Sequence, residues 1–194
     1  MLIATLSLPE QIVLTLAALI LLSSFLLLAQ VRLDSLITTF ALQGLLIVFA
    51  TVLMAFIAGK YHLLISAALT LVLKVFFIPG QLRLLVIRLN IRREVEVIGN
   101  PSLVMLFAAA LVLFSYYVAL PIRELSLVST RNTIAISLAV VLLGMLMIIS
   151  RRKAVTQVVG FMSMENGLFF AAVVSTHGMP MVVEFGIAFD VLVA

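Results

Sequence analysis

Long apolar segments separated by short polar joints are the feature of this sequence that most limits its fold. They lie at about 10–30, 34–58, 61–80, 101–120, 131–150, 154–175 and from 180 onward. Each is close to the roughly 20 residues that an α-helix needs to cross the ~30 Å hydrocarbon layer of a bilayer. With 65% of its residues hydrophobic and 10% charged, the chain has too little polar surface for a water-soluble domain. The sequence predicts an all-α polytopic membrane helix bundle of about seven transmembrane helices.

Basic residues are distributed unevenly over the joints. With the N-terminus outside, the inner joints hold Arg32, Arg83, Arg88, Arg92, Arg93, Arg151, Arg152 and Lys153, and the outer joints hold Lys60, Arg123 and Arg131. Because Lys and Arg are retained on the cytoplasmic side, this bias predicts an N-terminus outside the cell inner (cytoplasmic) membrane in a multi-pass protein. The net charge of +4 follows from this retention and gives no indication of nucleic-acid binding. The first apolar run has no basic n-region, so we expect a membrane span and no cleaved signal.

Redox chemistry within this chain is not expected. It contains no cysteine, and its two histidines, His62 and His177, are far apart in the sequence. Disulfides and thiolate-bound iron–sulfur clusters are therefore excluded within the chain, and a haem or zinc site is not expected. We expect the chain to bind no cofactor and no metal, so that any redox centre belongs to partner proteins.

One acidic residue, Glu165, lies in the middle of the apolar run 154–175. It follows the basic cluster 151–153 by about ten residues, which places it roughly 15 Å deep at 1.5 Å per residue, near the membrane centre. A charge at that depth costs about 2.5–3.5 kcal/mol on insertion scales. Intramembrane acids are therefore candidates for ion handling, with a partner elsewhere in the chain.

Lys74 is a candidate for that partner. It ends a stripe of polar residues spaced four apart on one helical face, namely His62, Ser66, Thr70 and Lys74. Its stem is too short to reach either interface comfortably, so we expect it to point into the bundle or a hydrated cavity. Pro79 removes the hydrogen bond to the carbonyl of Val75, so Pro79 and Gly80 predict a kink or break beside Lys74. A purely structural ion pair is the alternative role of Lys74.

The last apolar run adds two acids. Asp190 is expected at the depth of Glu165, and Glu184 lies about 9 Å nearer the outer surface and about 120° around the helix. This run ends at Ala194, about fifteen residues after Pro180 where roughly twenty are needed to cross, so we expect the natural chain to continue further.

These charges predict a polar layer at one level of the membrane, made by Lys74, Glu165 and Asp190. Pairing lowers the cost of burying each charge, and a proton gained or lost at one shifts the pKa of its neighbours, as a proton relay requires. Glu184 would be an outer entry or exit step. Water between these groups would be oriented by Gln43, Ser66, Thr70 and Asn166. The alternative is an ion-pair network that only holds helices in register.

Three other segments carry weaker expectations. The first apolar segment has only Thr15, Ser23 and Ser24 as polar residues, so we expect it to face lipid without a chemical role. In the second, Gln43 is an interhelical hydrogen-bond anchor more often than a site residue. The segment 81–96 mixes aliphatic residues with four arginines. It is typical of a helix end entering the cytoplasmic interface, where it meets lipid phosphates or a soluble partner, or is simply retained by its charge.

The run from Arg152 to Asp190 resembles the hydrogenase-4 component E family, a membrane subunit of formate hydrogenlyase and related group 4 nickel–iron hydrogenases. The resemblance is carried by Gly160-Phe161, Met164-Glu165-Asn166-Gly167, Val183-Glu184-Phe185-Gly186-Ile187-Ala188-Phe189-Asp190, Leu73-Lys74-Val75 and Ile78-Pro79. It extends over nearly the whole chain. The C-terminal three spans are in turn similar to the K-type subunit of respiratory complex I and the C-type subunit of multisubunit cation/proton antiporters.

That resemblance, with a weak internal echo between residues 41–45 and 164–168, divides one integral bundle into three parts. Residues 1–100 form an N-terminal three-span part with the Lys74 helix and a basic cytoplasmic joint. Residues 101–130 hold a linking span, and residues 131–194 form the K-type-like three-span part with Glu165 and Asp190. Glu165 corresponds to the midmembrane acid of the K-type subunit, and Asp190 or Glu184 offers the second acid.

The resemblance implies a non-catalytic membrane-arm subunit of a hydrogenase-type, complex I-like oxidoreductase. Its partners would be large antiporter-like membrane subunits, a membrane anchor subunit and a hydrophilic redox arm with nickel–iron and iron–sulfur subunits, with lipid around them. Electron transfer in those partners would be coupled to proton or sodium translocation through Lys74, Glu165 and Asp190. The alternatives are a stand-alone secondary ion transporter, with the same charges binding a substrate at the midplane, and a structural membrane anchor.

Overall fold

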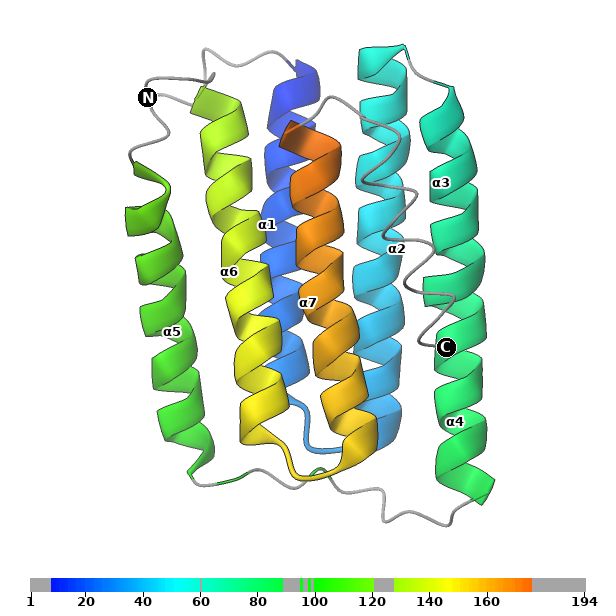
Figure 1. Ribbon diagram of the computed structural model, residues 1–194, viewed down its shortest axis with the longest axis vertical. Helices are drawn as coiled ribbons and strands as arrows, with labels where there is room; N and C mark the ends of the chain where they lie inside the picture. Colours follow the sequence, from blue (N-terminus) through cyan, green and yellow to red (C-terminus); the bar gives the residue numbers. More distant parts are fainter. Residues whose placement is uncertain are drawn as a thin grey trace.

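The computed structural model describes residues 8–59, 61–88, 95, 98, 100–120 and 128–175, without the side chains of residues 62, 128–131 and 175. This part is all-helical, as predicted, and its helices stand side by side in an upright bundle (Figure 1). They are α1 (Leu8–Ala29), α2 (Leu33–Ala58), α3 (His62–Thr70), a π-helix (Leu71–Phe77), α4 (Ile78–Arg88), α5 (Pro101–Val118), α6 (Val128–Ser150) and α7 (Ala154–Ser175).

Within the described residues, six helical stretches are long and apolar enough to cross a membrane: Leu8–Ala29, Leu33–Ala58, Leu63–Arg88, Pro101–Val118, Asn132–Ser150 and Ala154–Val174. They agree with the predicted spans to within a few residues, except that the third extends to Arg88. The predicted seventh span, from 180 onward, lies outside the described residues.

Large apolar side chains cover the outer faces of these helices. Phe56, Phe76 and Leu113 are 67%, 67% and 74% exposed, and many other Leu, Ile and Phe side chains are exposed with them. An apolar exterior of this extent is stable only against lipid or other protein, since water-soluble proteins keep such patches small. The chain is therefore a multi-pass membrane protein.

Helices α6 and α7 form the most closely packed pair, and α1 and α2 pack beside them. A Cβ atom on Gly144 of α6 would lie 2.6 Å from the backbone nitrogen of Met164 on α7, so only glycine fits there. Small residues at such crossings let membrane helices approach closely and gain van der Waals contact. Helix α5 lies at the edge of the bundle against α6 and α1 (Figure 1).

Two buried apolar clusters fill the interior, one towards each end of the bundle. On α2, Phe40 belongs to the first cluster and Ile47 to the second, with Gln43 buried between them. On α1, Ser23 and Ser24 lie between the clusters in the same way and are only 2% exposed. The expectation that the first segment faces only lipid is therefore wrong, because one face of α1 packs against α2 and α6.

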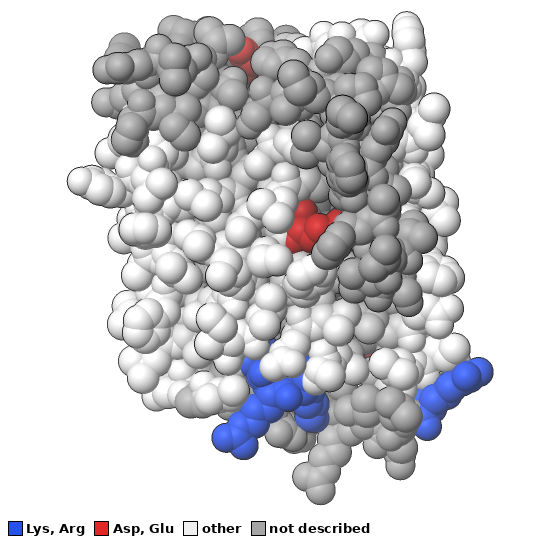
Figure 2. Space-filling view, viewed as in Figure 1, with Lys and Arg blue, Asp and Glu red and all other residues white. Residues whose placement is uncertain are grey.

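Basic side chains gather at one end of the described molecule, which we term the basic end (Figure 2). The α1–α2 joint, the C-terminal part of α4 and the α6–α7 joint lie at this end (Figure 1), and they carry Arg32, Arg83, Arg88, Arg151, Arg152 and Lys153. Arg151, only 1% exposed, donates hydrogen bonds from Nη2 to the carbonyls of Leu28, in the last turn of α1, and of Gln30, just after that helix. Burial lowers the pKa of the Arg151 guanidinium below its ordinary value, because desolvation disfavours the charged form. Arg151 thus ties the α6–α7 joint to α1.

Of the kink or break predicted at Pro79 and Gly80, the break does not occur, since the third span is helical through both residues. The irregularity lies one turn earlier, in the π-helix, where the N–H of Ile78 bonds the carbonyl of Leu73 five residues back. In an α-helix the carbonyl of Val75 would need the N–H that Pro79 lacks, whereas the π register offers it that of Gly80. The proline is accommodated by a change of helical register, with no interruption of the span.

Candidate functional site

A polar site lies at mid-length of the bundle, between the two apolar clusters. On α7, Glu165 and Asn166 lie between Met162 of one cluster and Phe169 of the other. Lys74 lies near the centre of the third span and is 1% exposed. The site is therefore enclosed above and below by apolar packing, which makes the dielectric constant around it low and its charge interactions strong.

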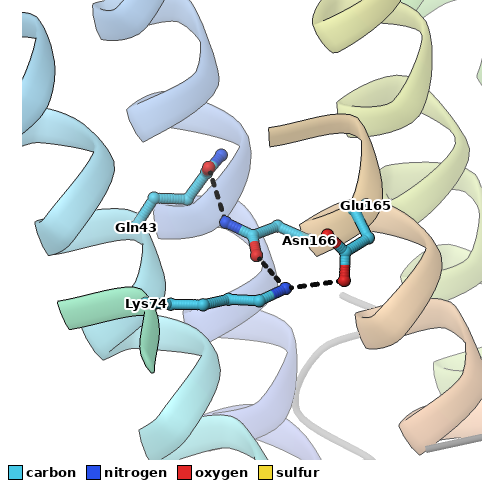
Figure 3. Close-up of polar contacts among 4 residues, drawn as sticks. All are labelled: Gln43, Lys74, Glu165 and Asn166. Atoms are coloured by element: carbon cyan, nitrogen blue, oxygen red, sulfur yellow. Dashed lines mark hydrogen bonds and ion pairs between the residues drawn. The ribbon is translucent and has the colours of Figure 1, made fainter. Parts of the chain in front are cut away.

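Lys74 and Glu165 form a buried ion pair (Figure 3). The Nζ atom of Lys74 is 3.1 Å from Oε1 of Glu165, with side chains 1% and 9% exposed. The same Nζ donates a hydrogen bond of 2.9 Å to Oδ1 of Asn166. It also lies 5.7 Å from the centroid of the Phe169 ring, within range of a cation–π interaction. Three neighbours on α7 thus stabilise one ammonium group.

The backbone around Lys74 directs its side chain into the site. Lys74 is the fourth residue of the π-helix, and π-helical turns in membrane helices often mark functional positions. Its Cβ and carbonyl pack on Gly44 of α2, where an added Cβ atom would lie 3.3 Å from the Cβ of Lys74. A larger residue at position 44 would push the third span away from α2 and lengthen the distance to Glu165.

A chain of hydrogen bonds continues from Lys74 across the bundle to α1. Asn166 donates from Nδ2 to Oε1 of Gln43 at 3.1 Å, and Gln43 donates from Nε2 to Oγ of Ser24 at 2.8 Å. Ser24 in turn donates to the carbonyl of Ile20 at 3.1 Å. Every donor in this chain points away from Lys74, so the dipoles present their oxygen ends towards the ammonium.

Comparison with known sequences supports a family assignment. No protein-family model and no solved structure matches the chain. Hydrogenase-4 component E of Escherichia coli K12 is 31% identical to it over 159 residues, which cover 80% of this chain and 72% of that protein. The chain belongs to the hydrogenase-4 component E family. The relatives in Escherichia coli O157:H7 and Shigella flexneri match with the same identity and coverage.

A further relative is an uncharacterized protein of Mycobacterium tuberculosis. It is 33% identical over 103 residues, which are 53% of this chain. The match covers 47% of that protein, so the chain spans about half the length of this relative. The family assignment therefore rests on the longer matches to component E.

The structure brings together only part of the predicted polar layer. Lys74, Glu165, Asn166 and Gln43 are in contact in one network. Ser66 and Thr70 are buried on the same span, and the hydroxyl of Thr70 has no hydrogen-bond partner in the described part of the chain. Asp190, Glu184 and the side chain of His62 lie outside the described residues. Among the described residues, no cluster of His, Cys, Asp and Glu could hold a metal ion.

Three contributors to the site were not expected from the sequence. Ser24 completes the hydrogen-bond chain, the Phe169 ring lies beside the ammonium, and Gly44 leaves room for the third span. Glycine beside Gln43 and phenylalanine one helical turn after Glu165 are signals in the sequence. Neither is specific, because glycine and phenylalanine are common in membrane helices for packing alone.

The ammonium of Lys74 has contacts on α7 besides its ion pair with Glu165. Asn166 accepts a hydrogen bond from it, and the Phe169 ring lies beside it. The protonation of Glu165 removes a full charge from a low-dielectric site, which changes the electric field across the neighbouring helices. Such a pair can store or pass on a single charge near the middle of the span.

Proposed function

We propose that this chain is a membrane subunit of a hydrogenase-type, complex I-like oxidoreductase and helps to couple electron transfer to proton or sodium translocation. Its membership of the hydrogenase-4 component E family and its membrane-spanning helices support the subunit role. The observation that carries the coupling role is the buried Lys74–Glu165 pair, 3.1 Å long and placed at mid-length of two spans. A charge pair at that depth is costly and is typical of ion pathways.

In this proposal Glu165 is the group that changes charge and Lys74 is the fixed cation. A change of charge in a neighbouring subunit shifts the proton affinity of Glu165, and the gain or loss of that proton alters the field felt by the next ionisable group. Asp190 is proposed as that next group and Glu184 as the outer step, on the basis of their positions in the sequence. Gln43 and Asn166 orient the pair, because their hydrogen bonds fix its geometry.

The proposed partners follow from the family. They are a hydrophilic arm that carries the nickel–iron and iron–sulfur centres, a membrane anchor subunit and large antiporter-like membrane subunits. Oxidation and reduction take place in that arm, and this chain supplies charged side chains within the cell inner membrane. The chain itself is proposed to be non-catalytic and to hold no cofactor.

The proposal is tested by Glu165→Gln in the assembled complex. Glutamine keeps an oxygen that can accept from Lys74 but cannot titrate near neutral pH, so the charge at position 165 is constant. Electron transfer by the soluble arm should stay at the wild-type rate, and ion translocation should fall several-fold. Glu165→Asp keeps a titratable group at this position, so this variant should retain part of the ion translocation. Asp34→Asn removes an exposed carboxylate at the basic end and is the control. Unchanged translocation in Glu165→Gln would exclude Glu165 from the mechanism.

A further inference from the structure

An apolar groove runs between α4 and α7 towards the basic end. Its volume is about 520 Å³, and its walls include Phe77, Gln81 and Leu85 on one side and Val158 and Met162 on the other. The π-helix, α4 and α7 all pack on α2, which keeps the two walls apart. The volume falls within the range of about 300–1,000 Å³ that is usual for sites that bind small molecules.

The groove reaches from the polar site to the basic end. Phe77 lies three residues after Lys74, and Met162 lies three residues before Glu165. Gln81 and Leu85 follow on the same face of α4, and the next position on that face is Arg88, the last residue of the helix. From Phe77 to Arg88 the helix rises by about 16 Å, half of a ~30 Å hydrocarbon layer. The groove and the arginine beyond its end thus cover about one leaflet together.

The charges at the mouth of the groove favour an anion. Arg88 is exposed, whereas Arg83 donates from Nη2 to the Thr38 hydroxyl of α2 at 3.0 Å. Arg152 and Lys153 precede α7, the opposite wall. Figure 2 shows basic side chains on both sides of this end of the molecule. An apolar channel at hydrocarbon depth that ends at a cation matches the two parts of one ligand, an acyl chain and a phosphate.

We propose that the groove binds an anionic phospholipid of the phosphatidylglycerol class. One acyl chain lies between α4 and α7 along Phe77, Leu85 and Met162, and the phosphate is held at Arg88. Gln81 is the polar side chain among the lining residues, and its amide N–H can donate to the ester oxygens of the lipid. This lipid would exclude water beneath the Lys74–Glu165 pair. The inference does not depend on the proposed ion translocation.

Single-tryptophan variants test the inference, because the chain contains no tryptophan. Phe77→Trp places the fluorophore in the groove. Phe76→Trp is the matched control, since Phe76 is 67% exposed and does not line the groove. The full chain is reconstituted in equal parts phosphatidylcholine and phosphatidylglycerol, with bromine on the acyl chains of one lipid at a time, and quenching of tryptophan fluorescence is measured.

At Phe77→Trp we expect brominated phosphatidylglycerol to be preferred as quencher by about fivefold, the electrostatic contribution of one arginine near a membrane surface. At Phe76→Trp the two lipids should quench equally. Arg88→Gln should abolish the preference at Phe77→Trp, while Arg32→Gln, an exposed arginine between α1 and α2, should leave it unchanged.

Equal quenching of Phe77→Trp by both lipids would overturn the inference, because any lipid would then serve. The absence of quenching by either lipid would also overturn it, since water or a protein segment would then occupy the groove. If Phe77→Trp does not fold, Val158→Trp on the opposite wall reports on the same space. The same two outcomes apply to that variant.

Discussion

At the scale of single residues, the Lys74–Glu165 pair predicts a particular pattern of stabilities. Removing one partner of a buried pair leaves an uncompensated charge and costs about 3–5 kcal/mol, whereas replacing both partners by neutral residues costs less. Lys74→Met should therefore lower the free energy of unfolding in detergent more than the double variant Lys74→Met/Glu165→Gln. Additive effects of the two substitutions would show that the pair is not coupled in the folded protein.

A second residue-scale prediction concerns Ser24. Ser24→Ala removes the acceptor of the Gln43 side-chain amide and leaves a buried donor unsatisfied, which costs about 1–3 kcal/mol. Ser23→Ala is the control, because Ser23 is equally buried but donates only to Ile20 within its own helix. The free energy of unfolding in detergent should therefore fall more in Ser24→Ala than in Ser23→Ala. Equal losses would mean that the bond between α1 and α2 contributes nothing.

At this scale the sequence predicted that Lys74 and Glu165 are partners, but it did not predict the contact of Lys74 with Phe169 or the hydrogen bond to Ser24. Lys74 and Glu165 are conspicuous because a charge in an apolar segment is rare. Ser24 and Phe169 are not conspicuous in the sequence, because serine and phenylalanine are common in membrane helices. The partner that each buried donor finds depends on how the helices rotate against each other, and periodicity does not determine that rotation. Asp190 and Glu184 stay predictions, since they lie outside the described residues.

At the scale of helices, the α6–α7 pair depends on close backbone approach. Gly144→Ala would bring a methyl group to within 2.6 Å of the Met164 nitrogen, so α7 must move away, at a cost of about 1–3 kcal/mol for overpacking. Gly80→Ala is the control, because nothing lies within 4 Å of its added Cβ atom. Alanine is also the better helix former, so Gly80→Ala should raise stability by about 0.4–1 kcal/mol. Thermal unfolding in detergent measures the stability of both variants. An unchanged stability of Gly144→Ala would contradict this packing of α6 against α7.

Helix positions were predictable and helix irregularities were not. The six described spans agree with the apolar segments because hydrophobic length alone sets them. Pro79 predicted a kink or break, but the sequence does not show whether a chain responds to a proline by breaking or by changing helical register. The π-helix at Leu71–Phe77 keeps the span continuous, and packing on Gly44 of α2 accompanies it. Whether the helix breaks or changes register becomes evident only from the packing of the third span on α2.

At the scale of the whole molecule, the proposed subunit role predicts how the protein purifies. Mild detergent extraction should bring large antiporter-like membrane proteins and an iron–sulfur arm with the chain, in fixed ratio. A stand-alone transporter would run alone or as a homo-oligomer. Mass spectrometry of the co-purified proteins distinguishes the two, and a chain that purifies without redox partners under conditions that keep the complex active would contradict the subunit role.

The central claim is that a charge at mid-membrane does more than hold helices together. It is tested most directly by the number of protons translocated per electron pair in the assembled complex with Lys74→Met/Glu165→Gln, reconstituted in vesicles. The double variant leaves no uncompensated charge, so assembly and electron transfer should persist. We expect the proton-to-electron ratio to fall clearly below that of the wild type. A wild-type ratio would contradict the claim and leave the pair as a structural anchor.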